Sequence, residues 1–298
     1  MDEKELESYR KAGKSAHKIL HAASRLIKPG VTYLEVTEKV EKMAEDDGVG
    51  IAFPVNISIN DAAAHYTAKD KDPGVFTDKD LVKLDIGVHV DGYIADTALT
   101  VDLTGEYGKM TEANERALEE ALKLVKPGVS VSRIGETVQS ILQKAGYRPI
   151  ENLTGHELKQ YDLHAGLSVP NIAVPYDWEV KEGMVLAIEP FATDGAGHVI
   201  ESRHAEIYSV IDAKPTRLKE ARDLLDMMEE RKGMPFASRW CAKKINPMKL
   251  NLVLNQLTQS GILRAYPPLH DKGKGMVSQF EHTLIVTEKG CEIITKGP

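Results

Sequence analysis

The clearest pattern in the chain is an alternation of apolar and polar positions on both sides of Asp91-Gly92. An Asp-Gly pair between two alternating segments is a strong signal for a tight two-residue hairpin turn. We therefore predict antiparallel strands over residues 81–90 and 93–101. Pairing of Val90 with Tyr93 fixes the register of every other pair, because side chains alternate strictly between the two faces of a sheet.

The two faces of this predicted hairpin differ in chemistry. One face is apolar and is expected to pack on the core, whereas the other carries Asp85 and Asp96. In the predicted register these aspartates are diagonal neighbours, about 7 to 8 Å apart at the backbone, and the small residues Gly87 and Ala98 leave room around them. Two like charges so close are unfavourable unless a cation or a proton neutralises them. A metal site is therefore one interpretation of this face, and a solvated sheet face is the other.

The first half of the chain resembles the second at an offset of 98 positions. The best-matched segments are residues 26–32 and 124–130, which share Lys-Pro-Gly-Val. Each segment predicts the end of one helix, a turn, and a second amphipathic helix that begins at Thr32 or Ser130, both good N-cap residues. Strand-rich stretches follow, over residues 51–101 and 150–211.

The repeat predicts a single α+β domain over residues 1–298, built from two pseudo-two-fold symmetric halves. His65 in the first half lies within one residue of the position that corresponds to His164 in the second. A functional site between the halves is therefore expected.

Composition narrows the class of protein. The 298 residues are 42% hydrophobic and 28% charged, which is typical of an ordinary globular chain. The net charge of −7 argues against specific nucleic-acid binding and against anionic membranes. No apolar run approaches the length of a membrane span or a signal peptide, so we expect a cytoplasmic protein. Cys241 and Cys291 lie too far apart for a C-x-x-C site and are expected to be reduced thiols.

Residues 212–270 predict an inserted helical subdomain. Residues 248–260 are apolar at helical spacing and residues 262–266 resume as a strand, a pattern similar to a winged helix. Basic residues lie nearby, namely Arg239, Lys243, Lys244 and Lys249. DNA binding is one interpretation. The net negative charge of the chain, and Tyr266 at the end of this segment, favour instead an accessory subdomain that forms a wall of a substrate pocket.

The second half offers residues that could complete a metal site. His156 follows a Thr-Gly pair, Glu189 ends an apolar run before a proline, and Glu281 opens an apolar strand. Carboxylates with one imidazole suit first-row divalent metals. His17 and His21 also share a helix face, but no acidic third ligand accompanies them, so a partly exposed face is expected there.

At this point the sequence resembles the methionine aminopeptidase, or pita-bread, family along nearly its whole length. The resemblance rests on the series Asp85, Asp96, His156, Glu189 and Glu281, which is similar to the five metal ligands of that family. Similar motifs surround His65, His164, Glu189 and Glu281, including Ala64-His65-Tyr66-Thr67 and Gln279-Phe280-Glu281-His282-Thr283. The stretch between Glu189 and Glu281 resembles the insertion of type II enzymes, and the short N-terminus resembles the archaeal form.

The resemblance implies a pita-bread fold and a two-metal hydrolase that uses Co, Mn, Fe or Zn. It implies that Glu189 is both a metal ligand and the proton shuttle, while His65 and His164 stabilise the oxyanion and position the substrate. It further implies that Phe53, Leu163 and Tyr266 line the pocket for a methionine side chain.

The implied reaction is removal of the N-terminal methionine from peptides and nascent chains with a small second residue. We expect a monomer that acts in the cytoplasm on nascent chains at the ribosome. Asp2 predicts that this chain keeps its own Met1. One alternative is an Xaa-Pro dipeptidase or aminopeptidase of the same fold, although such enzymes carry an additional N-terminal domain. The other is a non-catalytic pita-bread binding protein.

Overall fold

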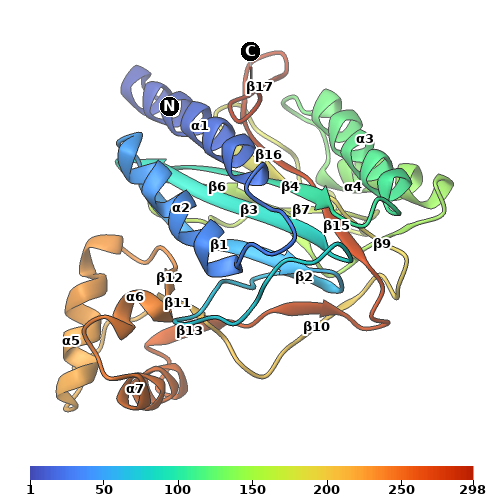
Figure 1. Cartoon of the computed structure of the whole chain (residues 1–298). Helices are drawn as coiled ribbons and strands as arrows, with labels where there is room; N and C mark the ends of the chain where they lie inside the picture. Colours follow the sequence, from blue (N-terminus) through green and yellow to red (C-terminus); the bar gives the residue numbers. More distant parts are fainter. Residues whose placement is uncertain (298) are drawn as a thin grey trace.

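An eight-stranded antiparallel sheet lies at the centre of the computed structural model, which describes residues 1–297 (Figure 1). The strand order is β1 (Gly50–Ile59), β3 (Leu81–Val90), β4 (Tyr93–Asp102), β16 (Glu281–Val286), β8 (Val185–Ile188), β6 (Thr154–Leu158) and β7 (Ser168–Pro170), with β17 (Cys291–Ile293) paired to β16. The order β1-β3-β4 on one side of the β4–β16 boundary mirrors β6-β8-β16 on the other. The predicted α+β fold with pseudo-symmetric halves is confirmed.

The register of the β3–β4 hairpin is the predicted one. Val90 pairs with Tyr93, Asp85 with Ala98 and Gly87 with Asp96. The apolar face is buried except near its ends, and the opposite face is also covered. Asp96 is only 3% exposed, and the Lys83 side chain is buried and donates from its ammonium to the backbone carbonyl of Asn60 at 2.7 Å, so a solvated sheet face is excluded.

Four helices cover the apolar face of the sheet. They are α1 (Glu3–Ser24), α2 (Tyr33–Asp46), α3 (Gly108–Leu124) and α4 (Val131–Lys144). The first pair packs on β1, β3 and β4, and the second pair packs on β8 and β16 (Figure 1). A capping box starts α1, because the Glu5 amide donates to Asp2 Oδ1 at 2.9 Å and the Asp2 amide donates back to Glu5 Oε2 at 2.8 Å.

The sequence repeat is a structural repeat. Thr32 caps α2 and Ser130 caps α4 through their side-chain oxygens. The Gly30 amide donates to the Phe76 carbonyl at 2.8 Å, and the equivalent Gly128 amide donates to the Val180 carbonyl at 2.9 Å. Both glycines have a positive φ, of 89° and 82°, which explains why Lys-Pro-Gly occurs twice.

Two three-stranded sheets flank the central sheet and carry functional segments. One has the order β10 (Val199–Glu201), β14 (Leu269–Asp271) and β2 (Ala62–Ala64). The other has the order β15 (Val277–Gln279), β9 (Phe191–Thr193) and β5 (Arg148–Pro149). His65 directly follows β2, and Gln279 ends β15, so these sheets set the position of both residues.

A separate group of elements follows β11 (Ile207–Val210) and projects away from both termini (Figure 1). Its helices are α5 (Lys219–Met228), η1 (Glu229–Arg231), α6 (Ser238–Ala242) and α7 (Pro247–Gln259), and its sheet has the order β12 (Phe236–Ala237), β11, β13 (Leu263–Tyr266). These elements enclose an apolar core of their own. The helix predicted over residues 248–260 and the strand over 262–266 match α7 and β13 within one residue.

The basic cluster of this inserted region is partly used for packing. Arg239 is 5% exposed and its guanidinium donates to Glu41 of α2 at 3.0 Å, while the Trp240 indole donates to the same carboxylate at 2.8 Å. Arg239 therefore fastens the inserted region to α2 and is not available to nucleic acid. Among residues 1–297, no helix is long and apolar enough to cross a membrane.

Candidate metal centre

The first half of the molecule supplies two carboxylates from neighbouring strands. Asp85 on β3 and Asp96 on β4 both line a pocket on the sheet face opposite to α1–α4. Asp96 is held from the backbone, because its amide donates to Thr283 Oγ1 at 2.8 Å and the Thr283 hydroxyl donates to the Asp96 carbonyl at 2.7 Å. This reciprocal pair joins β4 to β16 where the two halves meet.

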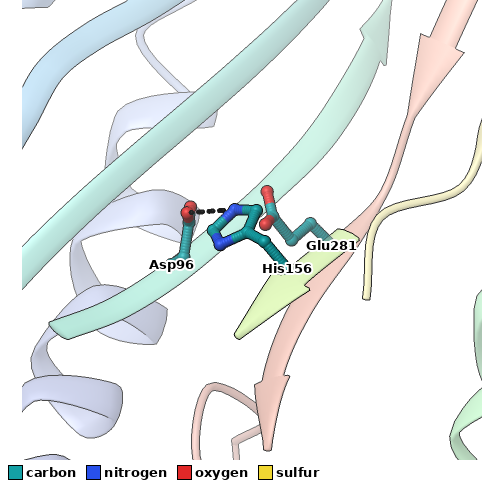
Figure 2. Close-up of side chains that lie close together, drawn as sticks. All are labelled: Asp96, His156 and Glu281. Atoms are coloured by element: carbon teal, nitrogen blue, oxygen red, sulfur yellow. Dashed lines mark ion pairs between the residues drawn. The ribbon is translucent and has the colours of Figure 1, made fainter. Parts of the chain in front are cut away.

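The second half supplies three residues from three separate strands. His156 lies on β6, Glu189 directly follows β8, and Glu281 opens β16. His156 Nε2 is 3.6 Å from Asp96 Oδ2 and 3.6 Å from Glu189 Oε1. Ligand atoms of Asp96, His156 and Glu281 all lie within 4.8 Å of one another (Figure 2). The sequence-predicted residues of both halves are therefore brought together.

The strand that carries His156 packs closely against its neighbour in the sheet. A Cβ atom at Gly155 would lie 2.3 Å from the Ala187 carbonyl oxygen, so β6 and β8 approach this closely only because residue 155 is glycine. Burial lowers the pKa of His156 to about 3, which keeps the ring neutral and leaves a nitrogen lone pair free for a metal.

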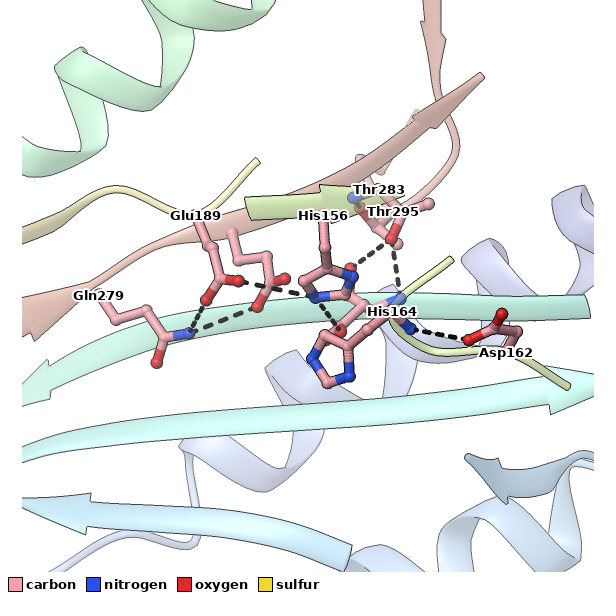
Figure 3. Close-up of polar contacts among 9 residues, drawn as sticks. His156, Asp162, His164, Glu189, Gln279, Thr283 and Thr295 are labelled. Atoms are coloured by element: carbon pink, nitrogen blue, oxygen red, sulfur yellow. Dashed lines mark hydrogen bonds and ion pairs between the residues drawn. The ribbon is translucent and has the colours of Figure 1, made fainter. Parts of the chain in front are cut away.

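Gln279, which sequence analysis did not identify as a site residue, donates hydrogen bonds to two of the carboxylates. The Gln279 side-chain amide donates to Glu189 Oε2 and to Glu281 Oε2, both at 3.4 Å (Figure 3). Its position two residues before Glu281 in an extended segment was an available signal. A single amide that bridges two carboxylates orients both.

The electrostatics of the cluster call for positive charge. Burial raises the pKa of Asp85 to about 7, although hydrogen bonds from Asp96 and Gln279 lower it. Burial, followed by repulsion from neighbouring carboxylates, raises the pKa of Asp96, Glu189 and Glu281 well above the usual range. Among the described residues that line the pocket there is no lysine or arginine that could neutralise these carboxylates.

The donor set fits divalent cations. The Oδ1 atoms of Asp85 and Asp96 are buried and have no hydrogen-bond partner within residues 1–297. Unsatisfied buried oxygens are costly and therefore indicate a missing partner. Four carboxylates and one neutral imidazole are the ligands that Mn, Fe, Co or Zn accept. A centre for divalent metal is the arrangement that satisfies these groups.

Two further histidines lie beside the cluster. The His65 ring centroid is 5.8 Å from that of Tyr266, and the His164 ring stacks on Tyr266 at 6.3 Å and lies 4.6 Å from His156. His65 has a positive φ of 66°, a strained conformation for a residue with a side chain. Burial lowers the pKa of His65 to about 4, so its ring is neutral near pH 7.

The pocket also has an apolar wall. Phe53, Leu163 and Tyr266, which the family resemblance implies for a methionine pocket, line it together with Ile207 and Pro235, which sequence reasoning did not identify. The polar residue Asn56 also lines the pocket. A Cβ atom at Gly87 would lie 2.1 Å from the Phe53 ring. The room left by Gly87 is therefore occupied by Phe53 rather than by the carboxylates.

His17, His21 and His282 lie outside the metal-ligand group. The His17 and His21 rings are 4.4 Å apart, and within residues 1–297 the one group of three or more close ligand atoms is that of Asp96, His156 and Glu281. His282 Nδ1 lies 2.9 Å from Thr295 Oγ1, so this neighbour of Glu281 forms its hydrogen bond outside the cluster.

Known proteins resemble this chain over nearly its whole length. The profile of metallopeptidase family M24 matches residues 7–288. The chain is 44% identical to the methionine aminopeptidase of Methanocaldococcus jannaschii over 98% of this chain and 100% of the relative. It is 46% identical to the methionine aminopeptidase of Archaeoglobus fulgidus over 99% and 100%, respectively.

Solved structures share the fold. The methionine aminopeptidase of Thermotoga maritima superposes with a TM-score of 0.74 at 23% identity, covering 100% of this chain and 98% of that one. The prolidase of Pyrococcus furiosus superposes with a TM-score of 0.61 at 20% identity, and only 65% of its chain is covered. At these identities the solved structures show only that the pita-bread fold is shared. The family match and the archaeal relatives show the class of enzyme. The chain therefore belongs to metallopeptidase family M24 and, within it, to the methionine aminopeptidases.

Proposed function

We propose that this enzyme removes the N-terminal methionine from peptides and nascent chains whose second residue is small, and that it does so in the cytoplasm as a monomer. The observation that supports this most directly is the convergence of Asp96, His156 and Glu281 beside an apolar pocket. A carboxylate-rich centre suits hydrolysis of a peptide bond, and an apolar slot of limited size suits one unbranched thioether side chain.

Two divalent cations are proposed as the cofactor, held by Asp85, Asp96, His156, Glu189 and Glu281. When bound, such cations acidify a coordinated water and polarise the scissile carbonyl. This ligand set is supported by the buried Oδ1 atoms of Asp85 and Asp96, which have no hydrogen-bond partner within residues 1–297. The carboxylates of Glu189 and Glu281 lie beside them in the same pocket.

Glu189 is proposed to move the proton. Its side chain is 14% exposed, and Oε1 lies 3.6 Å from His156 Nε2 within the cluster. A carboxylate that contacts the attacking water can accept its proton and deliver it to the leaving amine. Gln279, which donates to the far oxygen Oε2, leaves Oε1 directed towards the cluster.

His65 and His164 are proposed to bind the reacting carbonyl and the substrate backbone. Both rings line the pocket, and neither belongs to the group of mutually close ligand atoms. A neutral imidazole donates an N–H, which stabilises charge that develops on the carbonyl oxygen in the transition state. Phe53, Leu163 and Tyr266 would then hold the methionine side chain.

The test is metal-titrated cleavage of a Met-Ala peptide and of a matched Xaa-Pro peptide by the same preparation. We expect release of methionine from the first peptide, which rises with added Co²⁺ or Mn²⁺ and disappears with a chelator. Glu189→Gln should lower kcat by at least about 10²-fold, because it removes the proton carrier. The matched control is Glu182→Gln, an exposed change on the preceding turn, which should leave the rate unchanged.

Two outcomes would overturn the proposal. Faster cleavage of the Xaa-Pro peptide would make the enzyme a prolidase-like member of the family. No cleavage of either peptide by protein that carries divalent metal would favour a binding protein. Full activity of Glu189→Gln would remove the proposed proton carrier while leaving the substrate assignment intact.

A further inference from the structure

A second groove continues from the catalytic pocket towards the surface, and nothing in the proposed chemistry uses it. The two share Leu163, His164, Pro235 and Tyr266. We call this second cavity the outer groove. One wall is the loop after β6, with Tyr161 and Asp162, and the other is the inserted region, with Lys232 and Arg264.

The outer groove adjoins the catalytic pocket and offers a path for the rest of a substrate. If the first residue of a peptide occupies the apolar pocket, the chain leaves between His164 and Tyr266, which border both cavities. An extended chain advances about 3.3 to 3.6 Å per residue. The third to fifth residues of a substrate would therefore run along the outer groove.

Two cations stand on the inserted side of this path. Lys232 and Arg264 are both exposed, and neither forms an ion pair with any residue that the structure describes. The Lys232 ammonium lies 4.1 Å from the centroid of the Tyr161 ring on the facing wall, so this side chain reaches across the groove. Two cations without an ion-pair partner among the described residues therefore line one side of the groove, although the whole chain has a net charge of −7.

The acidic residue on the facing wall does not neutralise them. Asp162 is turned back into its own loop, where Oδ1 accepts the His164 amide at 3.2 Å (Figure 3). Arg264 lines the outer groove together with His164 and Tyr266, which also line the catalytic pocket. The cationic side of the groove thus reaches the edge of the catalytic pocket.

We propose that Lys232 and Arg264 are specificity-determining residues, which select substrates that carry acidic side chains at their third to fifth positions. The inference rests on the proposed function, because it concerns the part of the substrate beyond the methionine. Complementary charges attract the substrate during approach and hold it along the groove, whereas basic substrates are repelled. Exposed pairs of this kind are weak individually and are screened by salt.

The experiment compares three peptides that differ only at positions four and five, Met-Ala-Ser-Glu-Glu, Met-Ala-Ser-Gln-Gln and Met-Ala-Ser-Lys-Lys, each extended by the same neutral segment. We expect wild-type kcat/KM for the acidic peptide to exceed that for the basic peptide by about 3- to 10-fold at low ionic strength. The ratio should shrink towards one at 0.5 M salt, because exposed charges are screened. The readout is the ratio, which is independent of the absolute rate.

The variants decide whether the two named residues cause the ratio. The charge reversal Lys232→Glu with Arg264→Glu should invert it. The matched control is Lys243→Glu with Lys244→Glu, which makes the same change in net charge at exposed positions of the inserted region outside the groove and should keep the wild-type ratio. A reversed variant that keeps the wild-type ratio, or a control that inverts it, would overturn the proposal. Failure of wild type to release methionine from the Gln-Gln peptide would instead count against the proposed function.

Discussion

The two halves of the molecule contribute to the proposed metal centre in different ways. The first half supplies Asp85 and Asp96 from one hairpin, at positions fixed by a single tight turn. The second half supplies His156, Glu189 and Glu281 from three strands spread over residues 156–281, with the inserted region between the last two. One wall of the centre is therefore a local structure, and the other exists only after the whole sheet has assembled.

The comparison shows that the two halves share the elements that stabilise the fold but differ in the residues that they place in the site. The helix pairs and their Lys-Pro-Gly turns are nearly equivalent in both halves, because both must pack on the same sheet. The residues that meet in the centre are not equivalent, because the first half supplies two aspartates whereas the second supplies one histidine and two glutamates. Substitutions in the two walls therefore test whether they act as a single centre.

The largest effect is expected when one ligand is removed from either wall. Asp96→Asn on the hairpin and Glu281→Gln on β16 should each reduce kcat/KM by about 10³-fold or more, since both side chains meet at the same place. Metal content measured by mass spectrometry of the native protein should fall in both variants. A large loss in one variant and near-normal activity in the other would show that the walls are independent.

A smaller effect is expected at the two histidines outside the ligand group. His65→Ala and His164→Ala should each lower kcat by about 10²-fold, because each removes a donor to the developing oxyanion or to the substrate backbone. Metal content should stay at the wild-type level, which distinguishes these residues from His156. Loss of metal from either variant would place that histidine among the ligands instead.

A modest effect is expected at Gly87, the position on the hairpin that makes room for the apolar wall. Gly87→Ala should raise KM for a Met-Ala peptide by about 10-fold, because the new methyl group displaces the Phe53 ring. Adding Phe53→Leu should recover part of the loss if the clash is the cause. Unchanged kinetics in the single variant would show that Phe53 does not shape the substrate pocket.

The smallest effect concerns the stability of the metal-free protein. The folded-state pKa of Asp85 is raised to about 7 from an unfolded value of 3.8, so between these values the folded state binds more protons. The contribution of this group to stability is full below pH 3.8 and is lost as the pH rises through about 7. Asp85→Asn, which removes the charge, should therefore gain Tm relative to wild type as the pH is raised from 5 to 8.

The measurement is thermal unfolding in the presence of a chelator, and the expected change in the Tm difference is a few degrees. Asp78→Asn, at an exposed position, is the control. Divalent metal should reverse the order, because it stabilises the wild-type carboxylate and not the amide. A difference between Asp85→Asn and wild type that does not vary with pH would contradict the raised pKa.

The sequence by itself determined the features that depend on neighbours along the chain. Asp91-Gly92 and strict alternation set the hairpin register, and the repeated Lys-Pro-Gly with Thr32 or Ser130 set the helix pairs, because turns, caps and strand faces are local. The ligands of the second half were named by family resemblance, since a glutamate at the edge of an apolar strand carries no local signal of its partners.

Only the tertiary structure decided which residues meet across the sheet. It placed Gln279 between Glu189 and Glu281, filled the space at Gly87 with Phe53, and buried Arg239 against Glu41. It also set Lys232 and Arg264 along a groove that begins at the catalytic pocket. These contacts join residues far apart in the chain, and their distances depend on how sheets and helices pack rather than on any pattern that neighbouring residues can carry.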